Sequence, residues 1–243
     1  MLLKACLNGA RAPGSHPALP LTPDALAADA RRCVDAGAGA LHVHPRDAAG
    51  HESLAPEHIA AALHAIHAVC PGVPVGVSTG AWIVPLLAER LALIAAWAEG
   101  TELPDFASVN FVEAGALQVC EVLLTGGIGI EAGLSTSVDA LWLRDSGIAP
   151  RCLRVLIEPV EDDPAAALAT AAAIIAVLDA ADIHLPRLLH GVDAAAWPLL
   201  DAAYNRGYDA RIGLEDTLTM PDGTPVPNNA ALIAAAHALA ARH

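Results

Sequence analysis

The chain has 243 residues, of which 55% are hydrophobic and 16% are charged, and this balance excludes an intrinsically disordered protein. The formal net charge is −14 and Lys and Arg form no cluster, so we expect neither a nucleic-acid-binding face nor attraction to an anionic membrane. The N-terminal run Leu-Leu-Lys-Ala-Cys-Leu-Asn resembles a strand rather than a leader peptide. No apolar run approaches about 20 residues without Gly, Pro or charge, so we expect no membrane span.

Short runs rich in β-branched residues and leucine alternate along the chain with longer segments rich in alanine and leucine. The expected strands are residues 3–8, 40–44, 74–78, 106–110, 127–131, 153–158, 187–190 and 210–215. The expected helices are residues 23–37, 55–69, 85–98, 115–125, 136–145, 163–181, 193–206 and 227–241. Helix-start signals such as Thr22-Pro23 support them. Eight strand–helix units without a linker predict an α/β fold, a (β/α)8 TIM barrel that spans residues 1–243 as a single domain.

Every expected strand ends on, or just before, a polar residue. These residues are Asn8, His42 with His44, Ser78, Asn110, Glu131, Glu158, His190 and Glu215. Because the C-terminal ends of all barrel strands meet at one mouth, where barrel active sites lie, we expect them to gather there. The substrate-binding candidates among them are Asn8, Asn110, Glu131, Glu158 and His190. For Glu131 and Glu158 the alternative is a structural rim carboxylate, and for His190 it is a proton shuttle or a structural histidine.

His42 and His44 stand two residues apart on an expected strand, so both imidazoles project from one face. This spacing suits a zinc ion, which binds His nitrogens, although a pair of ordinary rim histidines is the alternative. A catalytic zinc site generally takes three protein ligands, and Glu215 is the best third candidate because strand eight closes next to strand one. Glu215 could instead cap a helix or pair with a surface Arg.

Several motifs follow one another in order from Asn8 to Leu232. They are N-G-A-R, T-P-D-A-L-A-x-D-A, A-G-A-x-x-L-H-V-H-P-R-D-x-x-G, V-S-T-G, A-S-V-N-F, R-I-G-L-E-D-T and P-N-N-A-x-L. Together they resemble the β-keto acid cleavage enzymes, the family that includes the 3-keto-5-aminohexanoate cleavage enzyme. The combination of H-x-H-x-R-D with a distant R-x-G-x-E-D is specific, and the resemblance covers nearly the whole chain.

The resemblance implies a TIM barrel that holds one zinc ion. The implied zinc ligands are His42, His44 and Glu215. It also implies a catalytic role for Arg211, assisted by Asp216, with Ser78 in the same site. The reaction of the family is C–C bond cleavage, in which a small β-keto acid and acetyl-CoA give acetoacetate and a new CoA thioester. We further expect a homo-oligomer, either a dimer or a tetramer.

The chain also departs from the family that it resembles. It is shorter around the fourth to seventh units, which leaves acetyl-CoA use open, because a CoA site needs loop surface and positive charge. The aminohexanoate enzyme has an acidic residue where this chain has Arg11, so we predict a substrate with a neutral or anionic tail. The alternative is that Arg11 points to solvent or pairs with a nearby carboxylate.

Two other functions remain open from the sequence. A metal hydrolase of the amidohydrolase type also uses H-x-H, but it carries this motif on the first strand and further His ligands on the fifth and sixth strands. A barrel that binds a metabolite without catalysis is the second alternative. The intact His42, His44, Arg211, Glu215 and Asp216 argue against it.

The cysteines are scattered and form no C-x-x-C pair. They are Cys6, Cys33, Cys70, Cys120 and Cys152. We interpret them as buried, reduced thiols that act as small hydrophobic residues, which is typical of a cytoplasmic protein.

Overall fold

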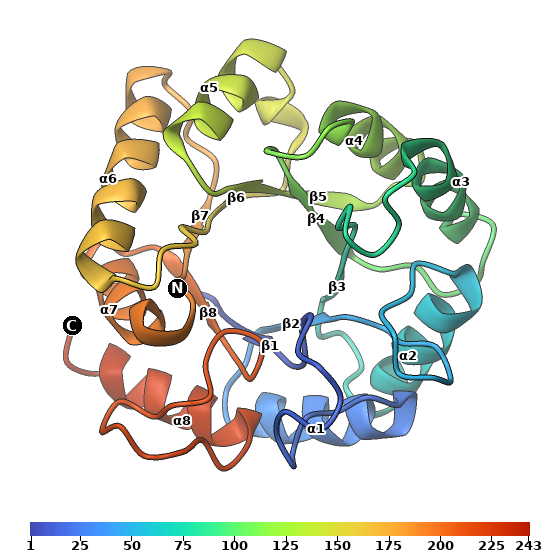
Figure 1. Ribbon diagram of the computed structural model, residues 1–243, viewed down its shortest axis with the longest axis horizontal. Helices are drawn as coiled ribbons and strands as arrows, with labels where there is room; N and C mark the ends of the chain where they lie inside the picture. The colour runs from blue at the N-terminus through green and yellow to red at the C-terminus, as the bar shows by residue number, and fades with distance from the viewer.

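Eight parallel strands close on themselves to form a barrel in the computed structural model, which describes residues 1–243 (Figure 1). The strands are β1 (Leu3–Cys6), β2 (Ala40–Val43), β3 (Val75–Ser78), β4 (Phe106–Asn110), β5 (Gly129–Leu134), β6 (Arg154–Ile157), β7 (Arg187–Leu189) and β8 (Asp209–Ile212). Each strand pairs with the next in chain order, and β8 pairs back with β1, with Leu3 opposite Ala210. Because the ring of strands is closed, the sheet has no exposed edge.

An outer layer of helices surrounds the barrel (Figure 1). The helices are α1 (Pro23–Asp35), α2 (Pro56–Val69), α3 (Leu87–Trp97), α4 (Ala116–Thr125), α5 (Ser137–Ser146), α6 (Pro164–Ala180), α7 (Ala196–Asn205) and α8 (Asn229–Ala240), with short 3-10 helices η1 (Ala149–Arg151) and η2 (Asp193–Ala195). Polar side chains cap the N-termini of several helices. The Thr22 hydroxyl accepts a hydrogen bond from the Ala25 N–H at α1, and Thr136 and Asp139 form a capping box at α5.

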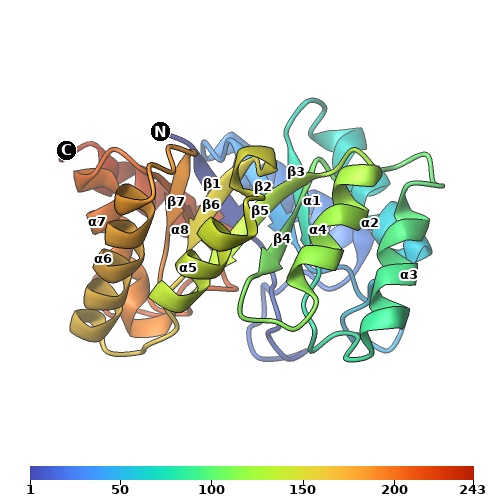
Figure 2. The ribbon, with the colours of Figure 1, turned by 90° about the horizontal axis from the view of Figure 1, so that it is seen from above.

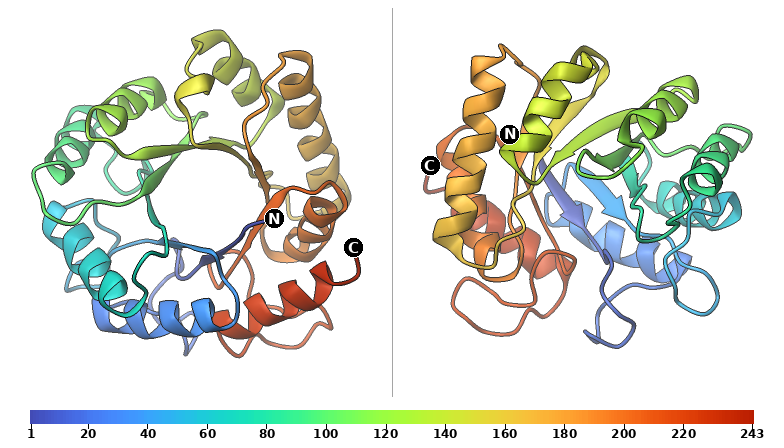
Figure 3. Two further views of the ribbon diagram at one scale, coloured as in Figure 1. Left: turned by 180° about the vertical axis from the view of Figure 1, so that it is seen from behind. Right: turned by 45° about the horizontal axis from the view of Figure 1, so that its top comes forward.

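All strands run in the same direction, so the loops that follow them gather at one end of the barrel. Both chain termini lie at the other end (Figure 2). The loops after β1 and after β8 project from the mouth that the strands point to (Figure 3). This end is therefore where the polar residues that follow the strands come together.

The (β/α)8 barrel expected from the sequence is confirmed, and each expected strand and helix is present. The fifth strand is the main correction, because it runs from Gly129 to Leu134 and not over residues 127–131. Gly127 has a φ of 74°, a conformation that glycine adopts readily, and it belongs to the turn after α4. The strand therefore ends later than expected, and Ser135 rather than Glu131 follows its C-terminal end.

Glu131 was expected at the mouth as a substrate-binding residue, and this placement is wrong. Its carboxylate lies inside the barrel with no exposed surface, 2.5 Å from Lys4 Nζ and 3.3 Å from Arg154 Nε. Lys4 and Arg154 also lie over the Phe106 ring, at 5.3 and 5.5 Å from its centroid. A buried carboxylate needs such partners, and these contacts make Glu131 part of the barrel interior.

No helix is long and apolar enough to cross a membrane. The five cysteines are all free and buried, as expected from the sequence, and burial raises the pKa of the Cys6 thiol well above its ordinary value. These thiols are therefore packed in the interior as small hydrophobic groups.

We predict that Lys4→Met strongly destabilises the barrel, by about 3–5 kcal/mol, because it leaves the Glu131 carboxylate buried without its closest partner. The double variant Lys4→Met/Glu131→Leu should recover most of this loss, since it removes the unpaired charge as well. Urea unfolding of the single and double variants measures both effects. Arg31→Met, which breaks an exposed pair with Asp35, is the matched control and should have a far smaller effect. A double variant less stable than Lys4→Met would contradict this role of the pair.

Candidate active site

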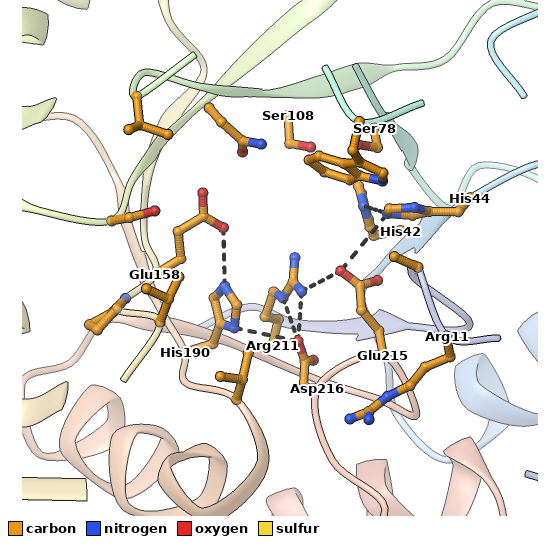
Figure 4. A pocket seen from close by; sticks show the side chains of 18 of the residues that line it. Arg11, His42, His44, Ser78, Ser108, Glu158, His190, Arg211, Glu215 and Asp216 are labelled. Carbon is orange, nitrogen blue, oxygen red and sulfur yellow. Dashed lines mark hydrogen bonds and ion pairs between the residues drawn. The ribbon is translucent and has the colours of Figure 1, made fainter. Parts of the chain in front are cut away.

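A cavity of about 580 Å³ opens at the C-terminal ends of the strands. The residues expected at the site that line it are Arg11, His42, His44, Ser78, Asn110, Glu158, His190, Arg211, Glu215 and Asp216. Figure 4 shows most of them projecting into one space from different strands. Asn8 and Glu131 do not line this cavity.

His42, His44 and Glu215 form a compact cluster at one side of the cavity. The Nε2 atoms of the two imidazoles are 3.0 Å apart, and His44 Nε2 is 3.9 Å from Glu215 Oε1. One ligand atom from each residue lies within 4.8 Å of the other two. Two imidazole nitrogens and one carboxylate are a donor set that zinc accepts, so these three residues could hold a metal ion.

Two glycines allow Glu215, which follows β8, to reach across β1 to the histidines of β2. A Cβ atom on Gly213 would lie 1.8 Å from the Cys6 carbonyl oxygen, so the backbones of β8 and β1 approach closely only because Gly213 has no side chain. A Cβ atom on Gly9, whose φ is 52°, would lie 2.3 Å from Glu215 Cγ. Both positions therefore need glycine for the cluster to form.

The protonation states in the cluster suit a metal ion. Burial lowers the pKa of His42 well below its ordinary value, which keeps its imidazole neutral and able to donate a lone pair. Burial raises the pKa of Glu215, but the neighbouring groups, the Arg211 guanidinium first among them, outweigh burial and lower this pKa to about 2. Glu215 Oε2 is buried without a hydrogen-bond partner. A buried carboxylate oxygen that has no protein partner and lies beside two imidazoles is free to bind a metal ion.

Glu52 and Trp82 orient His44, and the sequence patterns did not single out either residue. His44 Nδ1 is 2.5 Å from Glu52 Oε1, and Trp82 Nε1 donates to Glu52 Oε2 at 3.1 Å. The Trp82 ring also stacks on the His44 ring, with centroids 6.4 Å apart. Burial raises the pKa of Glu52, but the contacts with His44, Trp82 and Arg46 together outweigh burial and lower this pKa overall. A carboxylate on Nδ1 leaves the Nε2 lone pair facing the cluster, as in many metal-binding histidines.

Asn8 was expected to bind substrate, but its amide groups are used by the backbone. Oδ1 accepts from the His44 N–H at 2.9 Å, and Nδ2 donates to the His44 and Pro20 carbonyl oxygens at 2.9 and 3.1 Å. Asn8 has no exposed surface. It therefore fixes the main chain at His44 and has no group left for a substrate.

Arg211 lies between two carboxylates in the buried part of the site. Its NH2 group is 2.5 Å from Glu215 Oε1 and 2.6 Å from Asp216 Oδ1 (Figure 4). Burial lowers the pKa of Arg211, but Asp216 and the other nearby anions raise it well above its ordinary value. Burial likewise raises the pKa of Asp216, and Arg211 and His190 lower it to about 2. The three side chains therefore stay charged and hold one another in place.

His190 connects this ion pair to the far side of the cavity. Its Nδ1 is 3.4 Å from Asp216 Oδ1, and its Nε2 is 3.4 Å from Glu158 Oε2. Burial and Arg211 lower the pKa of His190, but the contacts with Asp216 and Glu158 outweigh them and raise it overall. Two carboxylates on opposite ring nitrogens therefore favour the imidazolium form.

Small polar side chains line the wall between β3 and β5. They are Ser78, Ser108, Asn110 and Ser135. The sequence patterns did not identify Ser108 and Ser135 as site residues. Ser108 lies inside β4 rather than at its end, and the C-terminal end of β5 was expected before Ser135. Asn110 Nδ2 donates to Glu113 Oε1 at 3.0 Å, so one donor of this wall is already engaged.

Arg11 lines the cavity, but its guanidinium turns away from Glu215 (Figure 4). Its NH2 group is 2.7 Å from Asp193 Oδ1, and its Nε donates to the Leu214 carbonyl at 3.1 Å. The alternative expected from the sequence, a pair with a nearby carboxylate, is the one observed. The charge of Arg11 is therefore compensated within the protein and gives no support to an anionic tail.

A family model described as beta-keto acid cleavage enzyme matches residues 1–125 and 164–243. The unmatched residues 126–163 contain β5, α5 and β6.

Among solved structures, a complex of ObcA with oxaloacetate aligns with a TM-score of 0.72 at 17% identity, and it covers 91% of this chain and 63% of that chain. A complex of ObcA with a C4-CoA adduct and oxalate aligns with a TM-score of 0.74 at 16% identity and with the same coverage. The 3-hexulose-6-phosphate synthase from Salmonella typhimurium aligns over all of both chains, with a TM-score of 0.58 at 12% identity. At these identities the structures share the fold alone, and the chain spans less than two thirds of the length of the ObcA chains.

Proposed function

The chain belongs to the beta-keto acid cleavage enzyme family, and on that premise we propose that it cleaves a C–C bond of a small β-keto acid with a divalent metal ion and a CoA thioester. The β-keto acid transfers its acyl group to the CoA sulfur, and its remaining carboxymethyl fragment joins the acetyl group of acetyl-CoA as acetoacetate. One observation carries the proposal: three ligand atoms of His42, His44 and Glu215 converge beside the buried Arg211 at the barrel mouth.

The three converging residues suit zinc better than magnesium or calcium, which prefer oxygen ligands throughout. When bound, a zinc ion there supplies a Lewis acid for the ketone and carboxylate oxygens of the keto acid. Glu52 and Trp82 support the same assignment, because they fix the ring and tautomer of His44.

Arg211 is proposed to stabilise the negative charge that develops on the substrate when the C–C bond forms or breaks. A guanidinium keeps its charge throughout the reaction, so its role is electrostatic rather than proton transfer. Its position is set before the substrate arrives, since Glu215 and Asp216 hold it from one side. Asp216 accordingly serves to position Arg211, and Ser78 offers a hydroxyl from the opposite wall.

His190 is proposed to carry a proton at Nε2, the ring nitrogen that faces Glu158 in the cavity. The neighbouring carboxylates favour its charged form, so it can donate a proton to a leaving group and take one back. Glu158 shares that proton and is the remaining acidic group at this side.

The CoA part of the proposal has separate support. One ObcA structure is a complex with a C4-CoA adduct, and another is a complex with the keto acid oxaloacetate. The homo-oligomer expected from the sequence belongs to the same proposal. The amidohydrolase alternative is less well supported, since β5 and β6 are followed by Ser135 and Glu158 instead of metal-binding histidines.

We predict that purified protein loaded with zinc holds about one ion per chain and consumes a β-keto acid in the presence of acetyl-CoA. His42→Ala/His44→Ala should lose both the ion and the turnover, because only one of the three ligands remains. Elemental analysis and a turnover assay on a panel of β-keto acids measure the two losses. His64→Ala, which changes an exposed histidine on α2, is the matched control. Equal zinc content in wild type and the double variant would rule out this metal site.

Arg211→Lys should keep the metal and the melting temperature but lower turnover by roughly 10²–10³-fold, the usual effect of losing one preorganised electrostatic donor. Lysine keeps a positive charge for Glu215 and Asp216, but it cannot reproduce the planar fork that reaches both carboxylates and the substrate. Steady-state kinetics, metal analysis and thermal unfolding separate these effects. Turnover within a few-fold of wild type would remove Arg211 from the chemistry.

A further inference from the structure

The barrel mouth has two chemically different halves. The metal cluster and Arg211 belong to β8 and β2, whereas β4 and β6 lie across the closed ring from them. On that far side Glu158 and small polar residues line the cavity, and the rim also carries Val112, which follows β4, and Val160, which follows β6. Their side chains are 66% and 67% exposed. Large apolar residues exposed at the rim of a polar cavity mark a surface that binds something apolar.

A second groove of about 370 Å³ continues from Val112 along the outside of the mouth. It shares Val112 and Glu113 with the main cavity, so the two hollows adjoin at these residues. Its apolar lining residues are Phe111, Val112, Ala114, Ala116, Leu117, Val138 and Trp142. Val138 and Trp142 project from α5 and are 55% and 63% exposed. The groove therefore extends the apolar rim from β4 to α5.

The ionisable groups of this groove are already satisfied. Glu113 accepts from the Ala81 N–H and lies 3.1 Å from Arg90 NH1. Asp139 accepts from the N–H groups of Ser135 and Thr136 as part of its capping box. No Lys or Arg lines the groove. The lining thus offers neither a free cation for a carboxylate or phosphate nor a free carboxylate for an ammonium group.

Val138, Trp142 and Val160 all lie within residues 126–163, the segment that the family model leaves unmatched. The metal cluster and Arg211 lie within the matched segments, whereas Glu158 lies in the unmatched one. The metal-binding residues and Arg211 therefore lie in the part of the chain that matches the family, and the α5 side of the groove lies in the part that does not.

We propose that this groove holds the saturated alkyl tail of the β-keto acid, so that the preferred substrate is a medium-chain 3-oxo acid. The inference rests on the proposed function, because it takes the reacting end of the substrate to lie at the metal cluster and Arg211. The tail then leaves the cluster across the mouth, passes Val112 and lies against Trp142. Each methylene that becomes buried there should raise kcat/KM about fourfold until the groove is full.

An alkyl tail fits these observations better than the other candidate occupants. The arm of CoA carries phosphates, which need cations, and the groove is lined by none. An ammonium tail would need a free carboxylate, and Glu113 and Asp139 are both engaged. A second copy of the chain could also cover an apolar face, and the experiment tests for it.

The test compares 3-oxobutanoate, 3-oxohexanoate, 3-oxooctanoate and 3-oxodecanoate with chains of similar length that end in an ammonium or a carboxylate. We expect kcat/KM to rise along the alkyl series and the charged tails to be poor substrates. Val112→Ser and Trp142→Ser should each reduce the increase of kcat/KM with alkyl chain length. Both side chains are exposed, so neither substitution should disturb the packed core or the folding of the barrel. Leu103→Ser changes an apolar residue of similar kind before β4 and should leave the series unchanged.

Binding of the unreactive 3-hydroxy acids, followed by tryptophan fluorescence and calorimetry, separates the groove from the reaction. Affinity that rises with chain length without any turnover would support the groove and overturn the proposed function. Turnover that is equal for all chain lengths, or best for a charged tail, would overturn the groove alone. Light scattering covers the remaining case: if Trp142→Ser dissociates an oligomer and leaves the alkyl series unchanged, a second copy occupies the groove and the proposal is wrong.

Discussion

The candidate site depends on one buried cation, the guanidinium of Arg211. Two adjacent carboxylates, Glu215 and Asp216, lie within 2.6 Å of it, and neither could remain ionised in the buried mouth without that charge. Arg211 lowers the pKa of both groups against burial, so Glu215 is an anion that faces the imidazoles of His42 and His44. The same contacts fix the guanidinium for chemistry, so structure and proposed catalysis share one arrangement of charges.

The metal cluster and Arg211 lie together at one side of the mouth. Gly213 lets the chain after β8 lie close to β1, and Gly9 leaves space for the Glu215 side chain to reach His44. Across the ring, Glu113 is paired with Arg90, and Val112 and Val160 are exposed at the rim. The proposed substrate, a keto acid, likewise has polar reacting oxygens at one end and a variable tail at the other.

Alternation of strands and helices was enough to predict the barrel and most of the mouth, because each strand ends near a polar residue and closure brings these ends together. Glu131 was misplaced because the glycine turn after α4 shifts β5 along the chain. The sequence patterns did not predict which side chains would form individual hydrogen bonds and ion pairs. Glu52 reaches His44 through a loop, and Asp193 reaches Arg11 from the far end of the chain. Such contacts depend on loop geometry, which residue spacing does not encode.

The position of a bound ion tests the account most directly. Crystals grown with zinc and measured at the zinc absorption edge should give an anomalous peak about 2.0–2.2 Å from the side chains of His42, His44 and Glu215. Glu52 should keep its contact with His44 in that structure. A structure with no peak at these residues, or with zinc only at the exposed group of His64, His67 and Glu102, would contradict the account.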